Sequence, residues 1–360
     1  MRSIKSLILL AIFALSLYSC DKDEYIPIED VISPVLVDIE NVPYQKLSDY
    51  NFFKSPMNLL EPEIGVLEYS LINELFTDYS IKKRFVWMPN EVKAVYQTDD
   101  KLLTFPKGTV LIKNFYYENV LPDRTRRIIE TRLLFKKASG WEFADYVWND
   151  SQTEALLDLN GSFTEITFEK EGVQRTINYR IPNLLECRVC HKSDDTSMPI
   201  GPKPQNMNMV KTYQDGTDVN QLVKWQEVGY LEETNATISA LPNWKNPSIS
   251  LKDRVRGYME INCAHCHMDG GHCSYRDIRF DYTSSFTDES LGICEEPDEN
   301  IGNGLTHIVR PGIPGRSAIY YRFDTNNESE RMPLLGRTVQ DEEGLELIED
   351  WINSLNVNCN

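Results

Sequence analysis

Hydrophobic residues follow a β-strand pattern between residues 65 and 182. Short runs rich in β-branched and aromatic residues alternate there with turn signals such as Pro106-Lys107-Gly108 and Asn160-Gly161. Runs of this kind, separated by tight turns, are typical of an antiparallel sheet. The runs cover residues 101–105, 109–117, 128–135, 141–148, 163–168 and 173–179. We therefore predict a β-rich domain over 65–182.

From residue 183 onward the strand pattern disappears, and apolar residues at helical spacing are joined by long polar stretches. Residues 341–355 are the clearest example, an amphipathic segment predicted to pack across 255–261, where Gly257 allows two helix backbones to approach. Its apolar stripe consists of Leu345, Ile348, Trp351, Ile352 and Leu355. The predicted fold class is α+β: an N-terminal antiparallel β-sheet domain followed by mainly α-helical structure, divided into 183–250 and 251–360.

The first residues are typical of an export signal. Arg2 and Lys5 precede an apolar stretch over 7–17, which is too short to span a bilayer as a helix, and Ser19-Cys20 follows. A small residue before a cysteine predicts a lipoprotein signal peptide over 1–19, with cleavage before Cys20 and acylation of its thiol. A plain secretory leader is the alternative. Residues 20–64 are rich in acidic residues and contain several prolines, and we predict a tether there.

This signal places the protein in the cell envelope, anchored to a membrane by lipid. No later segment is apolar enough for a transmembrane helix, so membrane contact is expected through the lipid alone. The acidic run 21–24 resembles a surface-export signal of some bacterial lipoproteins and favours the outer membrane, on its periplasmic or surface face.

Acidic residues outnumber basic ones, 55 against 37, which gives a formal net charge of −18. This balance argues against nucleic-acid binding, which needs a basic face, and against electrostatic adhesion to anionic lipids. Two interpretations of the charge are left open. One is solubility, and the other is an acidic docking face for a basic partner protein.

Two short motifs carry the candidate chemistry: Cys187-Arg188-Val189-Cys190-His191 and Cys263-Ala264-His265-Cys266-His267. Cysteines three apart on a helix lie on one face, so their sulfurs can reach the two vinyl groups on one porphyrin edge. The histidine that follows can then bind the iron, which is the attachment pattern of c-type haem.

We therefore predict two haem c groups, with thioether bonds at Cys187, Cys190, Cys263 and Cys266. The proximal iron ligands are then His191 and His267. A structural zinc site built from both motifs is the alternative. The export signal favours haem, because c-type haem is attached after export.

Met332 is the candidate distal ligand of the second haem. Pro333 follows it and biases its backbone toward an extended conformation, from which the thioether can project into a pocket. A methionine ligand raises the reduction potential. The alternative is a core methionine that only packs.

The first haem has no equally clear distal ligand. Met198, Met207 and Met209 follow His191, but each is more typical of packing than of ligation. His272 and His307 are further candidates, and the first iron is otherwise five-coordinate or capped by a group from the sheet.

Three cysteines fall outside the signal and the two motifs: Cys273, Cys294 and Cys359. Export to an oxidising compartment permits a disulfide among them. We favour Cys273 with Cys294, which closes a polar loop, although Cys359 is able to pair with either. His265, inside the second motif, is expected to be structural or exposed.

At these residues the chain resembles a family of bacterial diheme c-type cytochromes, some of them lipoproteins. The resemblance implies a class I cytochrome c-like domain over 251–360, a first haem-binding region over 183–250, and electron transfer to a redox partner protein. In class I cytochromes c, a Gly-Pro step like Gly201-Pro202 supplies the carbonyl that orients the proximal histidine. The shared strings are Leu75–Tyr79, Phe105–Thr109, Glu130–Leu134, Tyr146–Asn149, Ile200–Asn206 and Asn262–His267.

Residues 101–191 are also similar to β-sheet cytochromes c-prime and to the lysine-crosslinked haem cytochromes. Lys113 lies where a crosslinking lysine would be sought, and a solvent-facing sheet lysine is the simpler interpretation.

The leading functional hypothesis is a diheme cytochrome that carries electrons outside the cytoplasm, with a redox partner protein, no nucleic acid and membrane contact through its lipid. The alternative is a haem enzyme, peroxidase-like or reducing a small oxide, with an open first iron. A third hypothesis is a structural binding module in a surface complex. The sequence shows no catalytic acid–base group, so enzymatic activity is left open.

Overall fold

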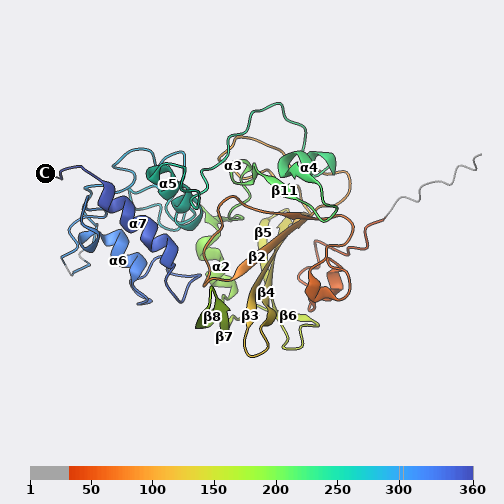
Figure 1. Cartoon of the computed structure of the whole chain (residues 1–360). Helices are drawn as coiled ribbons and strands as arrows, with labels where there is room; N and C mark the ends of the chain where they lie inside the picture. Colours follow the sequence, from red (N-terminus) through yellow and green to blue (C-terminus); the bar gives the residue numbers. More distant parts are fainter. Residues whose placement is uncertain (1–31, 300, 303, 360) are drawn as a thin grey trace, which may run out of the picture. The chain divides into compact units, whose positions relative to one another are not determined.

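An eight-stranded antiparallel sheet forms the centre of the computed structural model, which describes residues 32–299, 301–302 and 304–359 (Figure 1). The strand order is β1-β2-β3-β4-β5-β6, and β7 pairs with β3 and β8. The strands are β1 Val66–Tyr69, β2 Ile81–Trp87, β3 Val110–Val120, β4 Thr125–Lys137, β5 Gly140–Trp148, β6 Ala155–Asp158, β7 Ser162–Lys170 and β8 Val173–Ile181. The antiparallel sheet predicted over 65–182 is therefore present.

Alternating side chains give the sheet two apolar faces. On one face, Phe85, Ile112 and Phe135 pack against residues of the N-terminal segment, including Tyr50 and Phe52. That segment carries the short 3₁₀ helices η1 Leu47–Tyr50 and η2 Met57–Leu59. The part of the expected tether from residue 35 onward thus contributes to the core, because its apolar residues cover a sheet face that would otherwise meet water.

The opposite face is covered by the segment that follows the sheet. Val86, Leu111 and Phe143 pack there against Cys187 and Trp225. The covering elements are α2 Leu184–Cys190, β9 Lys192–Ser193, β10 Thr196–Ser197, α3 Pro204–Met207, β11 Val210–Thr212, β12 Asp218–Asn220 and α4 Gln221–Glu227. The first motif therefore lies directly against the sheet.

The remaining residues form a separate core around α5 Leu251–Asn262, η3 Pro314–Arg316, α6 Ala318–Asp324 and α7 Glu342–Ser354. As predicted, Ile348, Trp351 and Ile352 of α7 are buried in this core together with Tyr258 of α5. The close approach of the two helices occurs at Gly344, where an added Cβ would meet the Tyr258 ring. Gly257, expected at this contact, instead faces the carbonyl of Pro242.

The predicted fold class is nevertheless wrong. Strands hold 27% of the residues and helices only 18%, and the six helices are short, so the C-terminal part is not a mainly α-helical cytochrome c-like domain. Four short strands, β9 to β12, also occur after residue 183, where none was expected. Polar stretches such as 263–313 form turns, in which Gly270, Gly292, Gly302 and Gly304 adopt positive φ that a helix does not accept. Within the described residues, no helix is long and apolar enough to cross a membrane.

Candidate functional site

The second Cys-x-x-Cys-His motif begins where α5 ends. The side chain of Ser250 caps the start of this helix, and Cys263 forms its C-cap. The chain then turns tightly, because the N–H groups of Cys266 and His267 both donate to the Cys263 carbonyl at 3.1 Å. The turn brings both cysteines and the histidine to one side of a cavity.

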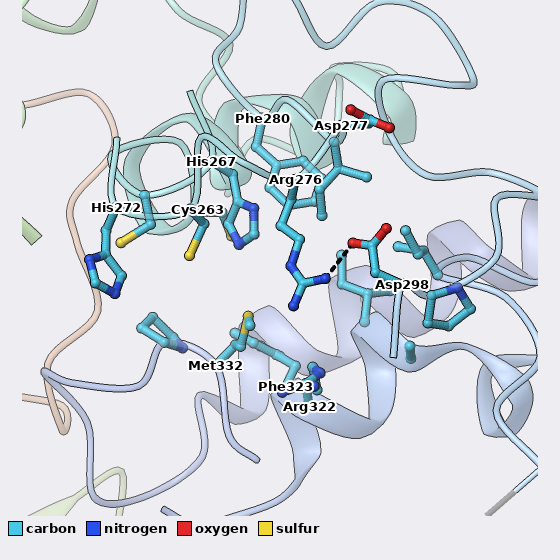
Figure 2. A pocket seen from close by; sticks show the side chains of 18 of the residues that line it. Cys263, His267, His272, Arg276, Asp277, Phe280, Asp298, Arg322, Phe323 and Met332 are labelled. Atoms are coloured by element: carbon cyan, nitrogen blue, oxygen red, sulfur yellow. Dashed lines mark hydrogen bonds and ion pairs between the residues drawn. The ribbon is translucent and has the colours of Figure 1, made fainter. Parts of the chain in front are cut away.

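This cavity has a volume of about 380 Å³ and separates His267 from Met332 (Figure 2). His267 and Cys263 approach it from the α5 side, and Met332 points into it from the opposite side. Its apolar lining includes Ile278, Phe280, Ile308, Ile319, Phe323, Leu334 and Leu335. A concave, largely apolar site with two possible axial ligands on opposite walls fits a haem whose thioether bonds are at Cys263 and Cys266.

The surroundings of His267 keep its imidazole in the form that binds metal ions. The residue is buried, and burial lowers the pKa of its imidazole to about 4, with smaller contributions from neighbouring cations. The ring is therefore neutral at neutral pH, which is the form that binds metal ions. Its edge packs on Phe280 with ring centres 5.2 Å apart. Its Nδ1 atom has no hydrogen-bond partner among the described residues.

The loop that carries Met332 is held by Arg337, which sequence reasoning missed. Arg337 is 2% exposed, and its guanidinium donates to the carbonyls of Met332 and Arg322 at 3.1 Å, of Phe323 at 3.0 Å and of Thr325 at 2.8 Å. The planar guanidinium carries several N–H donors, so one arginine can bond to several carbonyls at once. Arg337 therefore fixes both ends of the loop relative to α6.

Asp78 ties the same loop to the segment before β2. Its carboxylate accepts hydrogen bonds from the N–H of Thr338 at 2.6 Å, from the Thr338 hydroxyl at 2.9 Å and from the N–H of Val339 at 3.1 Å. Burial raises the pKa of Asp78, while these donors oppose the rise. Asp78 falls within the string Leu75–Tyr79 that carries the family resemblance, but nothing in the sequence indicated this role for it, and no motif marked Arg337.

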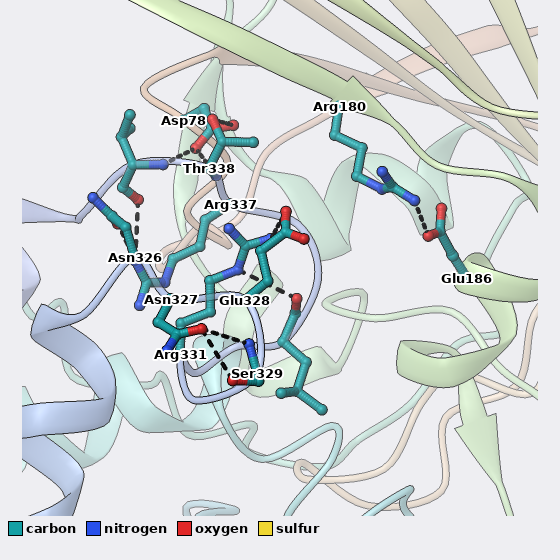
Figure 3. A network of polar contacts seen from close by, with 12 residues as sticks. Asp78, Arg180, Glu186, Asn326, Asn327, Glu328, Ser329, Arg331, Arg337 and Thr338 are labelled. Carbon is teal, nitrogen blue, oxygen red and sulfur yellow. Dashed lines mark hydrogen bonds and ion pairs between the residues drawn. The ribbon is translucent and has the colours of Figure 1, made fainter.

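The first motif is carried by α2, which the sheet positions. Asn183 and Glu186 form a capping box at the start of this helix, with both bonds at 3.0 Å. Arg180 of β8 also pairs with Glu186 (Figure 3). The helix buries Cys187 against the sheet and ends at Cys190. The two cysteines therefore lie one turn apart on a helix, as the spacing predicts.

His191 follows α2 as its C-cap residue. Its ring lies 4.9 Å from that of Phe143 in β5, and its Nδ1 is 2.8 Å from the Met198 carbonyl. Burial lowers the pKa of His191 to about 3, so the ring is neutral. A neutral imidazole that donates from Nδ1 to a carbonyl keeps Nε2 available for a metal.

The carbonyl that orients His191 is thus not the one expected from the Gly201-Pro202 step. The Gly201 carbonyl instead accepts from the N–H of Lys203 at 2.7 Å and from the side chain of Asn206 at 3.3 Å. Gly201 adopts a φ of +107° and has no room for a side chain, because an added Cβ would meet Leu71 at 2.6 Å. This step shapes the turn that leads into α3.

The other candidates for the first haem have different surroundings. Met207 is fully buried in the core beneath the sheet, which agrees with a packing role. Met198 contributes its carbonyl to His191, and Met209 is half-buried. Lys113 does not point freely into solvent: it is half-buried, 4.7 Å above the Phe115 ring. Burial, and then the neighbouring cations, lower the pKa of Lys113 well below its ordinary value.

The structure brings the two motifs together. One ligand atom each from Cys190, His265 and Cys266 lies within 4.8 Å of the others. Val189 and Cys190 line the same cavity as the second motif. His265, expected to be structural or exposed, is 5% exposed and belongs to this cluster. Cysteine and histidine are also zinc ligands, so the donor set by itself fits the zinc alternative as well.

The disulfide differs from the favoured pairing. Cys294 is bonded to Cys359, with their Cα atoms 5.2 Å apart, and Cys273 is a free, buried thiol. The N–H of Cys273 donates to the Cys266 carbonyl at 2.9 Å, which keeps Cys273 beside the second motif and away from Cys294. The C-terminal residues after α7 provide the partner instead.

The remaining histidines lie around the second motif. His272 is exposed and lines the cavity that contains His267 (Figure 2). The Nδ1 of His307 is 2.8 Å from the Thr306 hydroxyl, and its backbone pairs with that of Ser317.

Comparisons with known proteins give no assignment. No protein-family model matches the chain, and no curated protein or solved structure is significantly similar to it. The expected signal peptide over 1–19 and the lipidated Cys20 lie outside the described residues. Function is therefore argued from the motifs and from the cavity.

Proposed function

We propose that this protein is a diheme c-type cytochrome that transfers electrons outside the cytoplasm. The observation that carries the proposal is the placement of His267 and Met332 on opposite sides of one cavity, with Cys263 and Cys266 on its wall. Two thioether anchors and two axial ligands around an apolar space are what a c-type haem requires.

Each residue has a distinct part in this proposal. Cys263 and Cys266 would anchor the second haem, and His267 and Met332 would supply the ligands to its iron. Cys187 and Cys190 would anchor the first haem, and His191 would be a ligand to its iron. When bound, each haem supplies one-electron redox chemistry.

The surroundings set how readily the second haem accepts an electron. A thioether ligand favours ferrous iron, so Met332 would raise the reduction potential of a haem bound in this cavity. Arg337 maintains the Met332 loop through its four carbonyl contacts, which keeps the thioether directed at the cavity. These residues bind and orient, and none of them transfers a proton.

The haem-enzyme alternative concerns the first haem. The chain offers Met332 to the second haem, whereas the sequence provides no comparable partner for His191. An open first iron would bind a small ligand, and the second haem would then deliver electrons to it. This alternative keeps the same covalent attachment and differs only in what the first haem does.

The location and partners belong to the same proposal. Acylated Cys20 would hold the protein to the cell envelope, at the outer membrane, and a redox partner protein would exchange electrons with it. The net charge of −18 favours a basic partner protein and disfavours nucleic acid.

A haem count tests the proposal directly. The full chain is expressed together with a c-type haem attachment system, purified, and extracted with acidic acetone, which removes haem that is not covalently bound. Intact mass should then show two haems per chain, and Cys263→Ala/Cys266→Ala should retain one. An unmodified mass together with stoichiometric zinc by elemental analysis would support the zinc alternative and refute this function.

A further inference from the structure

A row of charged residues crosses four neighbouring strands of the sheet. Arg84 of β2 lies directly opposite Lys113 of β3, and Lys113 lies directly opposite Arg132 of β4. Asp145 of β5 follows Arg132 at the end of the row. Residues directly opposite on adjacent strands place their side chains on the same face, with Cβ atoms about 5 Å apart. Three cations are therefore neighbours on one face of the sheet, and Arg84, Lys113 and Arg132 are called the cation row below.

The two outer members of the cation row have carboxylate partners. The guanidinium of Arg84 bonds to the carboxylate of Glu74. The guanidinium of Arg132 donates to the two carboxylate oxygens of Glu130 at 3.0 and 2.6 Å, and it lies 3.8 Å from the carboxylate of Asp145. Burial raises the pKa of Asp145 against the opposing effect of Arg132, which weakens this carboxyl as a counter-charge.

Lys113, at the centre of the row, has no such partner. Its ammonium makes no ion pair or hydrogen bond within the described residues, and it lies 4.7 Å from the centre of the Phe115 ring. The guanidinium carbon of Arg132 lies 4.4 Å from the centre of the same ring. Like charges directly opposite each other destabilise a sheet, and a desolvated cation without a counter-charge adds to that cost. The cation row therefore lacks a negative charge at its centre.

Arg84 has an unused donor beside this position. The residue is 4% exposed, and its Nη2 makes no hydrogen bond in the part of the chain that the structure describes. A buried donor without an acceptor costs free energy, and the cost is larger for a charged group. Loss of the proton from Lys113 would reduce the repulsion but would leave two guanidiniums on either side of it. An anion beside Lys113 would neutralise the row and also offer an acceptor to Arg84.

We infer that the cation row binds a small oxyanion on this face of the sheet. The ligand is a negatively charged group with at least two acceptor oxygens, either a free inorganic ion or a carboxylate of a larger molecule. Guanidinium groups present N–H donors in a planar arrangement that matches such oxygens, and an ammonium adds a compact positive charge. This inference goes beyond the proposed function and does not depend on it.

Solvent reaches the cation row at its middle. Lys113 is half-buried and the side chain of Arg132 is 19% exposed, whereas Arg84 is almost fully buried. An anion that enters beside Lys113 and Arg132 would therefore have Arg84 on its inner side. The surroundings there are less polar than water, which strengthens hydrogen bonds between the cations and the anion.

A titration at constant ionic strength tests the inference. The full chain is purified, and sodium phosphate, sodium nitrate and sodium acetate are the probes, each exchanged against sodium chloride at neutral pH. Calorimetry should show one saturable site per chain for an oxyanion. The unfolding midpoint should rise with the concentration of that oxyanion, because a ligand that binds only the folded state stabilises it. Chloride offers a single spherical acceptor and should not replace the oxyanion.

A pair of lysine variants locates the site. Lys113→Met should weaken binding of the oxyanion by about tenfold or more, as expected for the loss of one charge-assisted hydrogen bond. Its unfolding midpoint without the oxyanion should not fall, because the repulsion within the row is relieved. Lys136→Met is the matched control and should bind as the native protein does. Lys136 is another half-buried lysine of β4, 5.8 Å from the centre of the Trp141 ring, and it makes no ion pair with a described residue.

Each outcome decides the question. Tightest binding of acetate supports a carboxylate ligand, and tightest binding of phosphate or nitrate supports a free inorganic ion. Absence of saturable binding, an equal effect of chloride, or binding that survives Lys113→Met overturns the site. If Lys113→Met fails to fold, the comparison of oxyanions with chloride on the native protein still gives the answer. The number of covalent haems is measured separately, so the proposed function is judged on its own result.

Discussion

Replacing Arg337 should destabilise the protein and release Met332 from the cavity. The guanidinium is 2% exposed and donates to four backbone carbonyls at 2.8 to 3.1 Å. A hydrogen bond to a charged group contributes about 1.5–3 kcal/mol, and such contributions are not additive within one network. Arg337→Met removes this donor from all of these buried carbonyls, so we expect a loss of about 3–5 kcal/mol in the free energy of unfolding, near the upper end for a single substitution.

Two measurements on the holoprotein check this expectation. Denaturant unfolding gives the change in stability, and the sulfur-to-iron charge-transfer band reports whether Met332 is bound to iron. The band should weaken in Arg337→Met well below the denaturant concentration at which the whole protein unfolds, because the loop is released first. Arg337→Lys should recover only part of the band, because a lysine keeps the charge but loses the planar fork.

Arg316→Met is a suitable control, because Arg316 is exposed and surface substitutions usually change stability by less than about 0.5 kcal/mol. Equal stability and an undiminished band in Arg337→Met would refute the role assigned to this arginine.

Four further expectations follow. Met332→Ala should abolish one charge-transfer band and lower one potential while the spectrum of the other haem persists; loss of two bands, or of none, would contradict the assignment. Cys20→Ala should move the protein from the membrane to the soluble fraction, and unchanged retention after cell fractionation would argue against the lipid anchor. Burial lowers the pKa of Lys82 to about 8, against 10.5 when unfolded, so its charge opposes folding below pH 8 and ceases to do so as the pH rises to 10.5. Between pH 8 and 10.5, the free energy of unfolding measured with denaturant should therefore rise more in the native protein than in Lys82→Met. An equal pH dependence in the two proteins would contradict this prediction. Cys359→Ser should cost about 2–5 kcal/mol by removing the bond to Cys294, whereas peptide mapping that finds Cys294 joined elsewhere would disprove the pairing.

The sheet could be predicted because its signals are local. Runs such as 109–117 and 128–135 correspond to β3 and β4, where β-branched and aromatic residues alternate between two apolar faces. The expectation of mainly α-helical structure after residue 183 failed because the helices there are short and the polar stretches between them make up much of this part of the chain. In the structure their backbone groups are satisfied in turns and short strands, and positive-φ residues such as Gly270 and Gly292 prevent helix formation.

The sequence alone determined the chemistry that spans a few residues: two Cys-x-x-Cys-His motifs, each able to present two sulfurs and an imidazole to one haem. Tertiary structure decided the relations between distant residues. It placed Met332 across a cavity from His267, and it put Cys190 beside Cys266. These positions depend on buried groups such as Arg337, which bonds to backbone carbonyls that come together only in the folded chain. A short motif fixes which ligand atoms lie near one another in the chain, whereas the distance between two motifs is set by the packing of all the residues that lie between them.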